Sequence, residues 1–473
     1  MPETPRAHGH EPDAVISLNP MYVRPPESAT IARWRLAPGE TEPSAAYQVV
    51  HEEAGLDGNP RRNLATFVTT WMEPEAERLY SESVGKNLVD KDEYSATAAI
   101  EERCWRIVAD LWNAPEPLDT IGASAIGSSE AGILGALALK RRWQHARRAA
   151  GKPTDRPNLV MSSAVQVCWA KFCNYFEVEP RLVPISKEHP VLDGSMLADY
   201  VDENTIGVVA ILGVTYTGMY DQVEDISRAL DEIEARTGLS IQIHVDAASG
   251  GMIAPFLQPE LKWDFRLPRV ASINTSGHKY GLVYPGLGWV VWREKTAVPE
   301  DLIFWVPYLG GNTPTLAINF SRPSAQVLLQ YYEFLRLGHE GYRRVQRASQ
   351  DVAKHFAAGV RTMPELTLWS DGGDIPVVAW QLSSAANGFW TLHDLSDRLR
   401  MRGWMVPTYA MPQDLTDIVV QRVVVRNGLS RDLADVFLSD LRSAIAELQS
   451  VSSVLTLPPH HVESAHERAV SVF

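Results

Sequence analysis

The sequence predicts an α/β protein with a large domain built on a mainly parallel sheet and a small α+β domain at its C-terminal end. Short segments such as 206–212 and 241–245 are apolar at nearly every position, as strands are when both faces of their sheet are covered. Segments with the apolar spacing of helices, such as 223–237, alternate with these strands, and this alternation is typical of parallel sheets. Beyond residue 350 the pattern becomes strand, helix and strand, which indicates a smaller α+β unit.

The order of the elements predicts three parts of the chain. Residues 1–60 are rich in Pro, Glu and Ser, so we expect an arm there, with one short amphipathic helix around 29–34. Residues 61–349 would form the large domain, and 350–473 the small domain with a flexible tail. The strands expected are 158–162, 206–212, 241–245, 270–274, 286–292, 377–382 and 418–425. The helices expected are 130–144, 166–176, 223–237, 392–402 and a long one at 325–360, interrupted at Gly338 and Gly341.

Composition excludes several classes of function. Hydrophobic residues make up 45% of the 473 residues and charged residues 22%, which is ordinary for a globular protein. The polar N-terminus lacks the order of a signal peptide and no apolar run is long enough to cross a bilayer, so we expect a cytoplasmic protein without stable membrane insertion. A net charge of −14 argues against nucleic acid as a partner. The three cysteines lack a Cys-x-x-Cys pair, so neither a disulfide framework nor a metal site is expected.

The most informative segment for chemistry is 276–281, with the sequence SGHKYG. It follows the strand expected at 270–274, and Gly277 and Gly281 leave room for the backbone to bend around Lys279. The amine of Lys279 would then be placed to form a Schiff base with an aldehyde cofactor. For this lysine alone, a surface position in a Gly-containing loop is the better interpretation.

A second segment, 244–251 with the sequence HVDAASGG, places Asp246 at the C-terminal end of a buried strand. Open α/β folds bind ligands at that end of their strands. There the carboxylate would pair with a protonated pyridine nitrogen and keep the ring an electron sink. The alternative is that Asp246 simply caps a helix.

A third segment, 126–130 with the sequence IGSSE, is a turn from a strand to a helix and carries Ser128 and Ser129. Free amides and the dipole at a helix N-terminus bind phosphate readily, although such a segment alone is more often plain capping. A phosphate cradle, a strand-end aspartate and a Gly-flanked lysine, in this order in one α/β domain, predict a pyridoxal-phosphate enzyme.

Longer stretches resemble one family. From about residue 56 onward the chain resembles bacterial and plant glutamate decarboxylases, on the stretches 63–67, 86–87 with 90–91, 120–121, 126–130, 203–208, 213–218, 263–270 and 317–323. The resemblance implies the type I, aminotransferase-like fold of pyridoxal-phosphate enzymes, with pyridoxal 5'-phosphate as the cofactor. It implies decarboxylation of L-glutamate to 4-aminobutyrate and carbon dioxide, in amino-acid metabolism and acid resistance.

By this resemblance Lys279 would hold the cofactor, Asp246 would face the ring nitrogen, and Ala248 and Gln166 would lie on the two faces of the ring. The remaining positions implied at the cofactor are Ser128, Ser129, Ser276 and His278 at the phosphate and Thr215 near the ring substituents. Ser321 resembles a position that reaches the phosphate of a neighbouring subunit, which implies a homodimer or a higher oligomer such as a hexamer.

The resemblance also implies a substrate pocket. Its distal-carboxylate end would be formed by Thr66, Phe67, Asn87 and Asp90. Arg422 would receive the α-carboxylate region. The loop 305–311 would close over the site as a flap, with Tyr308 or Lys279 returning a proton to the substrate.

Two departures from the family pattern stand out. The family commonly has a histidine four residues after the glutamine on the ring, where this chain has Ala170. The tail lacks the Trp- and Lys-rich stretch of calmodulin-regulated plant members, so calmodulin is not expected as a partner. For the tail histidines His460, His461 and His466, a functionally silent role is the better interpretation.

Other functions stay open on the sequence alone. Lys279 and Asp246 would serve an aromatic amino-acid decarboxylase, a carbon–carbon lyase or an aminotransferase equally well. The polar groups of Thr66, Asn87 and Asp90 favour a short carboxylate over an aromatic ring. A scaffold that has lost catalysis is a further alternative, favoured by Ala170 and opposed by the intact Lys279 and Asp246.

Overall fold

The computed structural model describes residues 16–18, 29–31, 34–116, 119–307, 313–386 and 390–452. The chain divides into two units, Met1–Asn59 and Pro60–Phe473. In the first unit, β1 (Ile16–Leu18) pairs antiparallel with β2 (Ala29–Ile31), and α1 spans Pro43–Ala54. The short helix expected around 29–34 is therefore wrong, because Ala29–Ile31 is a strand. The β-branched Thr30 and Ile31 favour that conformation, and so short a helix is marginal.

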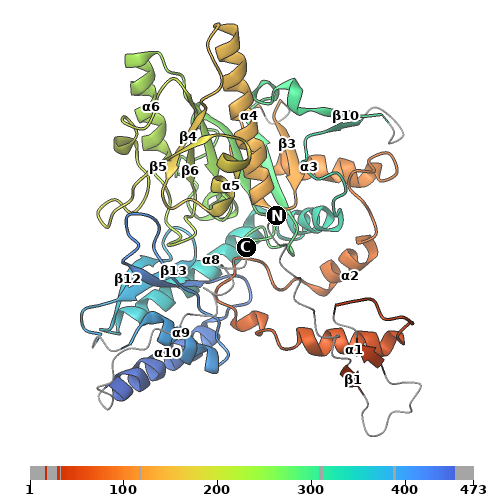
Figure 1. Ribbon diagram of the computed structural model, residues 1–473, viewed down its shortest axis with the longest axis vertical. Coiled ribbons are helices and arrows are strands. Elements are labelled where there is room, and N and C mark those ends of the chain that lie inside the picture. The colour runs from red at the N-terminus through yellow and green to blue at the C-terminus, as the bar shows by residue number, and fades with distance from the viewer. Residues whose placement is uncertain are drawn as a thin grey trace, which may run out of the picture. The chain divides into compact units, whose positions relative to one another are not determined.

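The second unit contains a mixed, mainly parallel sheet of seven strands (Figure 1). Its spatial order is β3 (Ile121–Ala125), β9 (Gly288–Trp292), β8 (Val270–Thr275), β7 (Ile243–Asp246), β6 (Thr205–Ile211), β4 (Asn158–Ser162) and β5 (Glu179–Val183). The five strands from β8 to β5 are parallel to one another, and β9 is antiparallel to both of its neighbours. The predicted fold class is confirmed.

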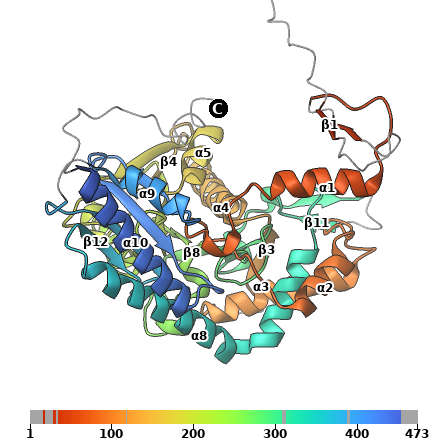
Figure 2. The ribbon, with the colours of Figure 1, turned by 90° about the horizontal axis from the view of Figure 1, so that it is seen from below.

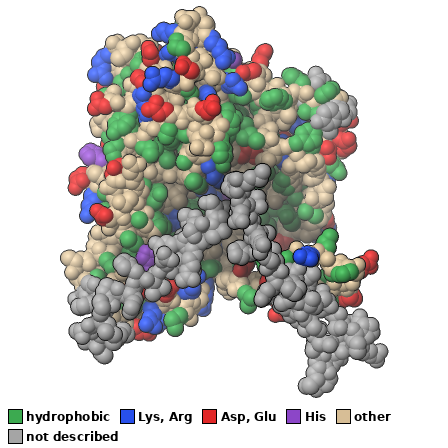
Figure 3. Space-filling model, in the orientation of Figure 1, with side chains coloured by type: hydrophobic (Ala, Val, Ile, Leu, Met, Phe, Trp, Pro, Cys, Tyr) green, Lys and Arg blue, Asp and Glu red, His purple; other side chains and the backbone are tan. Residues whose placement is uncertain are grey.

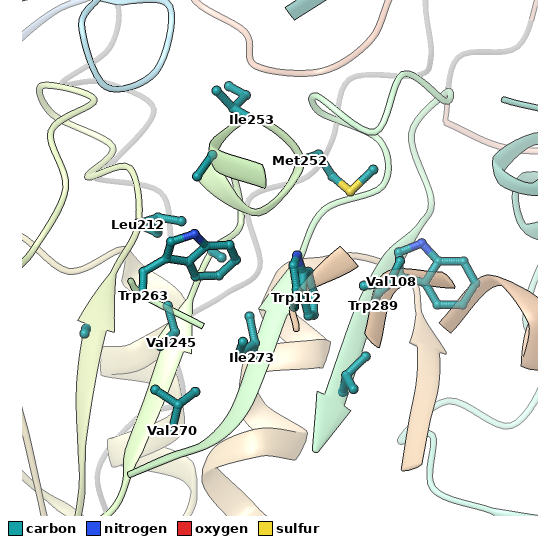
Figure 4. Close-up of a cluster of buried hydrophobic side chains, with 14 of the residues drawn as sticks. Val108, Trp112, Leu212, Val245, Met252, Ile253, Trp263, Val270, Ile273 and Trp289 are labelled. Atoms are coloured by element: carbon teal, nitrogen blue, oxygen red, sulfur yellow. The ribbon is translucent and has the colours of Figure 1, made fainter. Parts of the chain in front are cut away.

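Helices cover both faces of this sheet. Successive strand residues point to opposite faces, so Val245 and Ile273 pack with Val108 and Trp112 on one side (Figure 4). The helices of this unit before α8 are α2 (Pro74–Ser83), α3 (Ser95–Leu111), α4 (Ser128–Ala149), α5 (Val167–Tyr175), α6 (Val223–Thr237) and α7 (Ala254–Leu257). Short 3-10 turns lie at Pro60–Arg62, Gly194–Met196, Gly250–Met252, Lys295–Ala297 and Glu300–Leu302.

The long helix α8 (Ala325–Arg361) leads to a smaller antiparallel sheet. The helix breaks at Gly338, whose φ of 54° is left-handed, as expected, but it continues through Gly341, because glycine weakens a helix without having to end it. The smaller sheet has the order β12 (Leu366–Asp371), β13 (Val377–Leu382), β15 (Val419–Val424) and β14 (Thr408–Ala410). The helix α10 (Arg431–Ser452) packs against both α8 and α9 (Leu392–Met401) and completes this part (Figure 2). The division at residue 349 stays a prediction.

A separate hairpin, β10 (Phe304–Val306) with β11 (Thr313–Thr315), carries the segment expected to form the flap. Tyr308 and most of the loop 305–311 lie outside the described residues, as do the tail histidines. Acidic and basic side chains are interspersed on the face in Figure 3 rather than gathered by sign. In the part of the chain that the structure describes, no helix is both long enough and apolar enough to cross a membrane.

Candidate active site

Lys279 lies in a tight turn directly after β8. Its Nζ is 3.4 Å from Ser249 Oγ and 5.1 Å from the centroid of the Phe67 ring. The turn needs glycine, because a Cβ on Gly281 would lie 2.4 Å from the carbonyl oxygen of Gly277. Burial lowers the pKa of the Lys279 amine. A lysine with a lowered pKa holds more of its amine in the neutral, nucleophilic form.

Asp246 ends β7, and its carboxylate accepts three hydrogen bonds. The indole Nε1 of Trp169 donates to Oδ2 at 2.7 Å. The side-chain Nδ2 of Asn274 donates to Oδ1 at 3.1 Å, and the backbone N–H of Ala248 donates to the same oxygen at 3.2 Å. The Asp246 side chain is buried, and all three donors are neutral. Such a carboxylate is fixed in orientation for a cationic partner.

An anion cradle forms where β3 turns into α4. The N-cap of α4 is Gly127, which offers no side-chain cap, so the first helical amides have no capping side chain among the residues that the structure describes. A Cβ on Gly127 would lie 3.0 Å from His278 Cε1, so the histidine lies directly against the turn. The Nδ1 of His278 accepts from the Leu287 N–H at 3.1 Å, which assigns the ring proton to Nε2. Burial lowers the pKa of His278 to about 4, so the ring is neutral over most of the pH range.

Ser276 adds an orphaned polar atom to the same region. It precedes Gly277 in the lysine turn and is fully buried. Among the described residues its Oγ has no hydrogen-bond partner. A buried hydroxyl without a partner costs free energy, so it is expected to serve a ligand that the protein binds.

Arg422 lies on β15 next to the lysine turn. Its guanidinium donates to the carbonyl oxygens of Thr215 at 2.5 Å and Ala65 at 2.7 Å. Its carbon atom Cζ lies 4.6 Å from the centroid of the Phe67 ring. The side chain is buried, and its Nε has no partner in the described part of the chain. A buried guanidinium whose hydrogen bonds go to neutral carbonyl oxygens, with no carboxylate paired to it among the described residues, is suited to receive a carboxylate.

The segment that contains Thr66 and Phe67 is held on both sides. Thr69 donates from its N–H to the carbonyl of His278 and from its hydroxyl to the carbonyl of Lys279, at 2.9 and 2.8 Å. Arg426 donates to the carbonyl of Thr66 at 3.3 Å and to Thr70 Oγ1 at 2.8 Å. The segment is therefore fixed against the lysine turn.

Asn87 is held by hydrogen bonds with Ser321 and Arg322. Its Nδ2 donates to Ser321 Oγ at 3.3 Å, and its Oδ1 accepts from the N–H of Arg322 at 3.0 Å. The Asp90 backbone follows in a turn, with its N–H donating to the Asn87 carbonyl. Glu130, in the first turn of α4, accepts from the N–H of Ile318 at 3.0 Å and of Ile126 at 2.8 Å. The contacts that hold Asn87 lead to Ser321, whereas those of Thr66 and Phe67 lead to Lys279.

Comparison with known proteins identifies the family. The model of the pyridoxal-dependent decarboxylase conserved domain matches residues 38–383. The chain belongs to the pyridoxal-dependent decarboxylase family. Glutamate decarboxylase beta of Listeria innocua is 48% identical over 92% of this chain and 94% of its own length. Glutamate decarboxylase of Aliivibrio fischeri is 47% identical, over 90% of this chain and 92% of its own.

Solved structures agree with the assignment. A glutamate decarboxylase of Lactobacillus brevis superposes with a TM-score of 0.87 at 45% identity, covering 91% of this chain and 97% of that one. A sphingosine-1-phosphate lyase of Burkholderia pseudomallei superposes with a TM-score of 0.73 at 21% identity over 90% and 98% of the two chains, and it supports the fold alone. This decarboxylase therefore has the type I fold that the resemblance implied.

The residues present in this decarboxylase fit its cofactor, pyridoxal phosphate. The uncapped first amides of α4 and the unpartnered Ser276 hydroxyl suit a phosphate group. The donor-held carboxylate of Asp246 suits a protonated ring nitrogen. The Lys279 amine, with its lowered pKa, suits an aldehyde carbon. In the part of the decarboxylase that the structure describes, no three His, Cys, Asp or Glu side chains gather as they would around a metal ion.

The structure places the other predicted positions of this decarboxylase as follows. Gln166 is the N-cap of α5, where its Oε1 accepts from the Cys168 N–H at 2.6 Å. Ala170 is exposed on the same helix. Thr215 contributes its carbonyl to Arg422, and Ala248 contributes its amide to Asp246. The roles assigned to all of these residues by resemblance stay predictions.

Sequence reasoning about this decarboxylase missed three residues around Asp246: Trp169, Asn274 and His244. Nothing in the sequence around Trp169 separates it from an ordinary core tryptophan. Its hydrogen bond joins residues 77 positions apart. The one available signal was polar residues, Ser272 and Asn274, in a strand otherwise expected to be apolar on both faces.

Proposed function

We propose that the protein decarboxylates L-glutamate to 4-aminobutyrate and carbon dioxide. The observation that carries the proposal is the buried guanidinium of Arg422, which has a free Nε and lies beside Phe67 near the Lys279 amine. The similarity to glutamate decarboxylases over more than nine-tenths of the chain supports the choice of substrate. In the expected pocket, the Thr66 hydroxyl would stand where an aromatic substrate needs an apolar surface.

When bound, pyridoxal phosphate supplies the electron sink that takes up the pair of electrons left by the departing carboxylate. The carboxylate of Asp246 would pair with the protonated ring nitrogen. Hydrogen bonds from Trp169 and Asn274 stabilise the charge of that carboxylate. Arg422 binds and orients a substrate carboxylate through its fork of donors. Thr66 and Phe67 would form the pocket for the other carboxylate, together with Asn87 and Asp90 from a neighbouring chain.

Lys279 serves both at the start and at the end of the cycle. Its amine would hold the cofactor before substrate arrives, and its lowered pKa favours the neutral nitrogen that bonds to an aldehyde carbon. The proton for the substrate Cα is delivered from Lys279 Nζ or from Tyr308 in the flap. Closure of the flap would exclude water and so suppress side reactions.

We further propose that the working unit is a homodimer or a higher homo-oligomer. If Ser321 reaches the phosphate of a neighbouring subunit, Asn87 must go with it, because a hydrogen bond joins their side chains and the Arg322 N–H binds the same amide. Each active site would then combine Lys279, Phe67 and Arg422 of one chain with Asn87 and Ser321 from another. Because the reaction consumes one proton per turnover, we propose a role in acid resistance, for which the protein would act in the cytoplasm.

The test is a product assay on purified protein supplied with pyridoxal phosphate. Glutamate, aspartate, tyrosine and cysteine sulfinate are offered over an acid-to-neutral pH range, and carbon dioxide and amines are quantified. Carbon dioxide and 4-aminobutyrate from glutamate alone support the proposal, and their loss in Lys279→Ala ties them to this site. Carbon dioxide from tyrosine, or keto acid in place of carbon dioxide, would favour an aromatic decarboxylase or an aminotransferase. Bound cofactor without any product would favour the scaffold.

A further inference from the structure

The register of β7 and β8 places two pairs of polar side chains side by side. His244 is the partner of Ser272, and Asp246 is the partner of Asn274. These residues alternate with Val245 and Ile273, so they point to the face opposite the apolar cluster of Figure 4. On that face they meet α4 and α5. All four side chains are buried, which makes unsatisfied polar atoms costly.

The donors and acceptors of the hydrogen bonds among Ser272, His244 and Asn274 can be assigned. Nε2 of His244 lies 2.7 Å from Asn274 Oδ1, which can only accept, so Nε2 carries the ring proton. His244 Nδ1, 2.7 Å from Ser272 Oγ, therefore accepts from the serine hydroxyl. Burial lowers the pKa of His244, in agreement with a neutral ring. Asn274 is thereby fixed with its Nδ2 toward Asp246.

Trp169 completes the arrangement from α5. Its indole N–H donates to Asp246 Oδ2, and its ring lies 5.3 Å from that of His244. The helix α4 makes room for both rings with glycine. A Cβ on Gly135 would lie 2.4 Å from His244 Cε1, and one on Gly132 would lie 3.3 Å from Trp169. Each oxygen of Asp246 thus receives a directed side-chain donor.

We propose that Trp169 and the Ser272–His244–Asn274 chain are positioning residues that keep Asp246 ionised and so keep the proton on the cofactor's ring nitrogen. The inference deepens the proposed function and rests on it. A carboxylate and a pyridine nitrogen share one proton, and neutral donors on the carboxylate lower its affinity for that proton. Removing a donor leaves the carboxylate charge less stabilised, so the shared proton moves from the ring nitrogen toward Asp246. The ring then becomes a weaker electron sink, and its contact with Asp246 loses ionic character.

The test compares Trp169→Phe with Trp404→Phe. Trp404 is also fully buried and also donates to a carboxylate at 2.7 Å, that of Asp440, but it lies in the core of α9, α10 and the small sheet. Both substitutions remove the same kind of bond and retain a ring. We expect Trp169→Phe to weaken binding of pyridoxal phosphate to the apoenzyme roughly ten- to a hundred-fold, the range for a hydrogen bond to a charged group. Trp404→Phe should leave it unchanged.

The position of the proton is measured separately. In holoenzyme loaded with pyridoxal phosphate that carries ¹⁵N in the ring, the nitrogen resonance should move from the protonated toward the neutral position in Trp169→Phe and stay in Trp404→Phe. Turnover should fall while KM for glutamate is retained. Asn274→Ala gives a second comparison, with Asn158→Ala as its control, because Asn158 is buried and donates to Asp202 at 2.9 Å.

The outcomes separate the two proposals. If wild-type protein binds no pyridoxal phosphate or yields no carbon dioxide from glutamate, the proposed function itself fails. If wild type binds and decarboxylates, but Trp169→Phe and Asn274→Ala match their controls in affinity and ¹⁵N shift, the positioning role is overturned. If Trp169→Phe does not fold, the comparison of Asn274→Ala with Asn158→Ala decides the question.

Discussion

The guanidinium carbon of Arg422 lies 4.6 Å from the centroid of the Phe67 ring. Lys279 Nζ lies 5.1 Å from the same centroid, so one aromatic ring lies against both the guanidinium and the amine of the site. The stacking fixes the guanidinium plane, and its two bonds to carbonyl oxygens fix its rotation. The donor fork of Arg422 is therefore set before any substrate arrives.

Arg422→Lys should lower kcat/KM for glutamate by about a hundred-fold or more, because an ammonium cannot reproduce the fork and its stacking. Steady-state kinetics measures the loss. Arg293→Lys is the matched control, since Arg293 also donates to backbone carbonyls and lies 5.5 Å from the centroid of Phe265. An equal loss of activity in both variants would show that Arg422 acts only through stability.

Ser276→Ala should separate stability from cofactor binding. Its hydroxyl is buried without a partner among the described residues, so its removal should raise the free energy of unfolding of the apoenzyme by about 1 kcal/mol. The same change should weaken pyridoxal phosphate binding by about ten-fold, because a phosphate oxygen loses a donor. Thermal unfolding and cofactor titration of the apoenzyme give the two numbers. Destabilised apoenzyme with unchanged cofactor affinity would contradict the assignment of this hydroxyl to the phosphate.

Glu333 on α8 should make stability depend on pH. The side chain is buried, and burial raises its pKa to about 7, with the charge of Glu73 adding to the effect. Its folded pKa lies above its unfolded value, so the folded state is favoured below about pH 4 and this advantage is lost as pH rises through 7. Glu333→Gln should therefore stabilise the protein at pH 8, by up to about 3 kcal/mol, and change little at pH 4.

Denaturant unfolding of both proteins at the two pH values tests this prediction. Glu340→Gln, which changes an exposed glutamate on the same helix, is the control. A gain in stability that is equal at pH 4 and pH 8 would mean that Glu333 is not the titrating group.

Gly135→Ala should disturb the packing of His244 and so lower both stability and cofactor affinity. The added Cβ would lie 2.4 Å from the buried His244 ring, which has no space to retreat. We expect a loss of about 1–3 kcal/mol in the free energy of unfolding, together with weaker cofactor binding. Gly85→Ala, where a Cβ would meet no atom within 4 Å, is the control for changes in the unfolded chain. Wild-type stability in Gly135→Ala would mean that this part of the core is looser than the structure indicates.

Local patterns predicted the large elements well. The strand 158–162 and the helix 223–237 were predicted with the bounds of β4 and α6, because apolar spacing within one segment determines both. The same reasoning placed Asp246 at the end of a strand and Lys279 in a turn between glycines. It was wrong about 29–34, where six residues carry too little pattern to separate a helix from a strand.

The detailed site could not be read from local pattern. Trp169, His244 and Asn274 matter through strand register and helix packing, which join residues between 28 and 77 positions apart. Arg422 entered through family resemblance, because an arginine in an otherwise largely apolar strand carries no sign of its hydrogen-bond partners Thr215 and Ala65. Likewise, only the structure ties Asn87 to Ser321.

The hydrogen bond between Asn87 and Ser321 has a genetic consequence. Suppose that Asn87 and Ser321 complete the site of a neighbouring chain. A chain with Lys279→Ala and another with Asn87→Ala are each inactive as homodimers, yet a mixed dimer contains one site made wholly of unaltered residues. Random pairing of equal amounts would restore roughly a quarter of wild-type activity, as the two-fold symmetry of such a dimer requires. Two defective copies of the gene in one cell would then rescue each other, whereas defects at Lys279 and Arg422, which lie in the same half-site, would not.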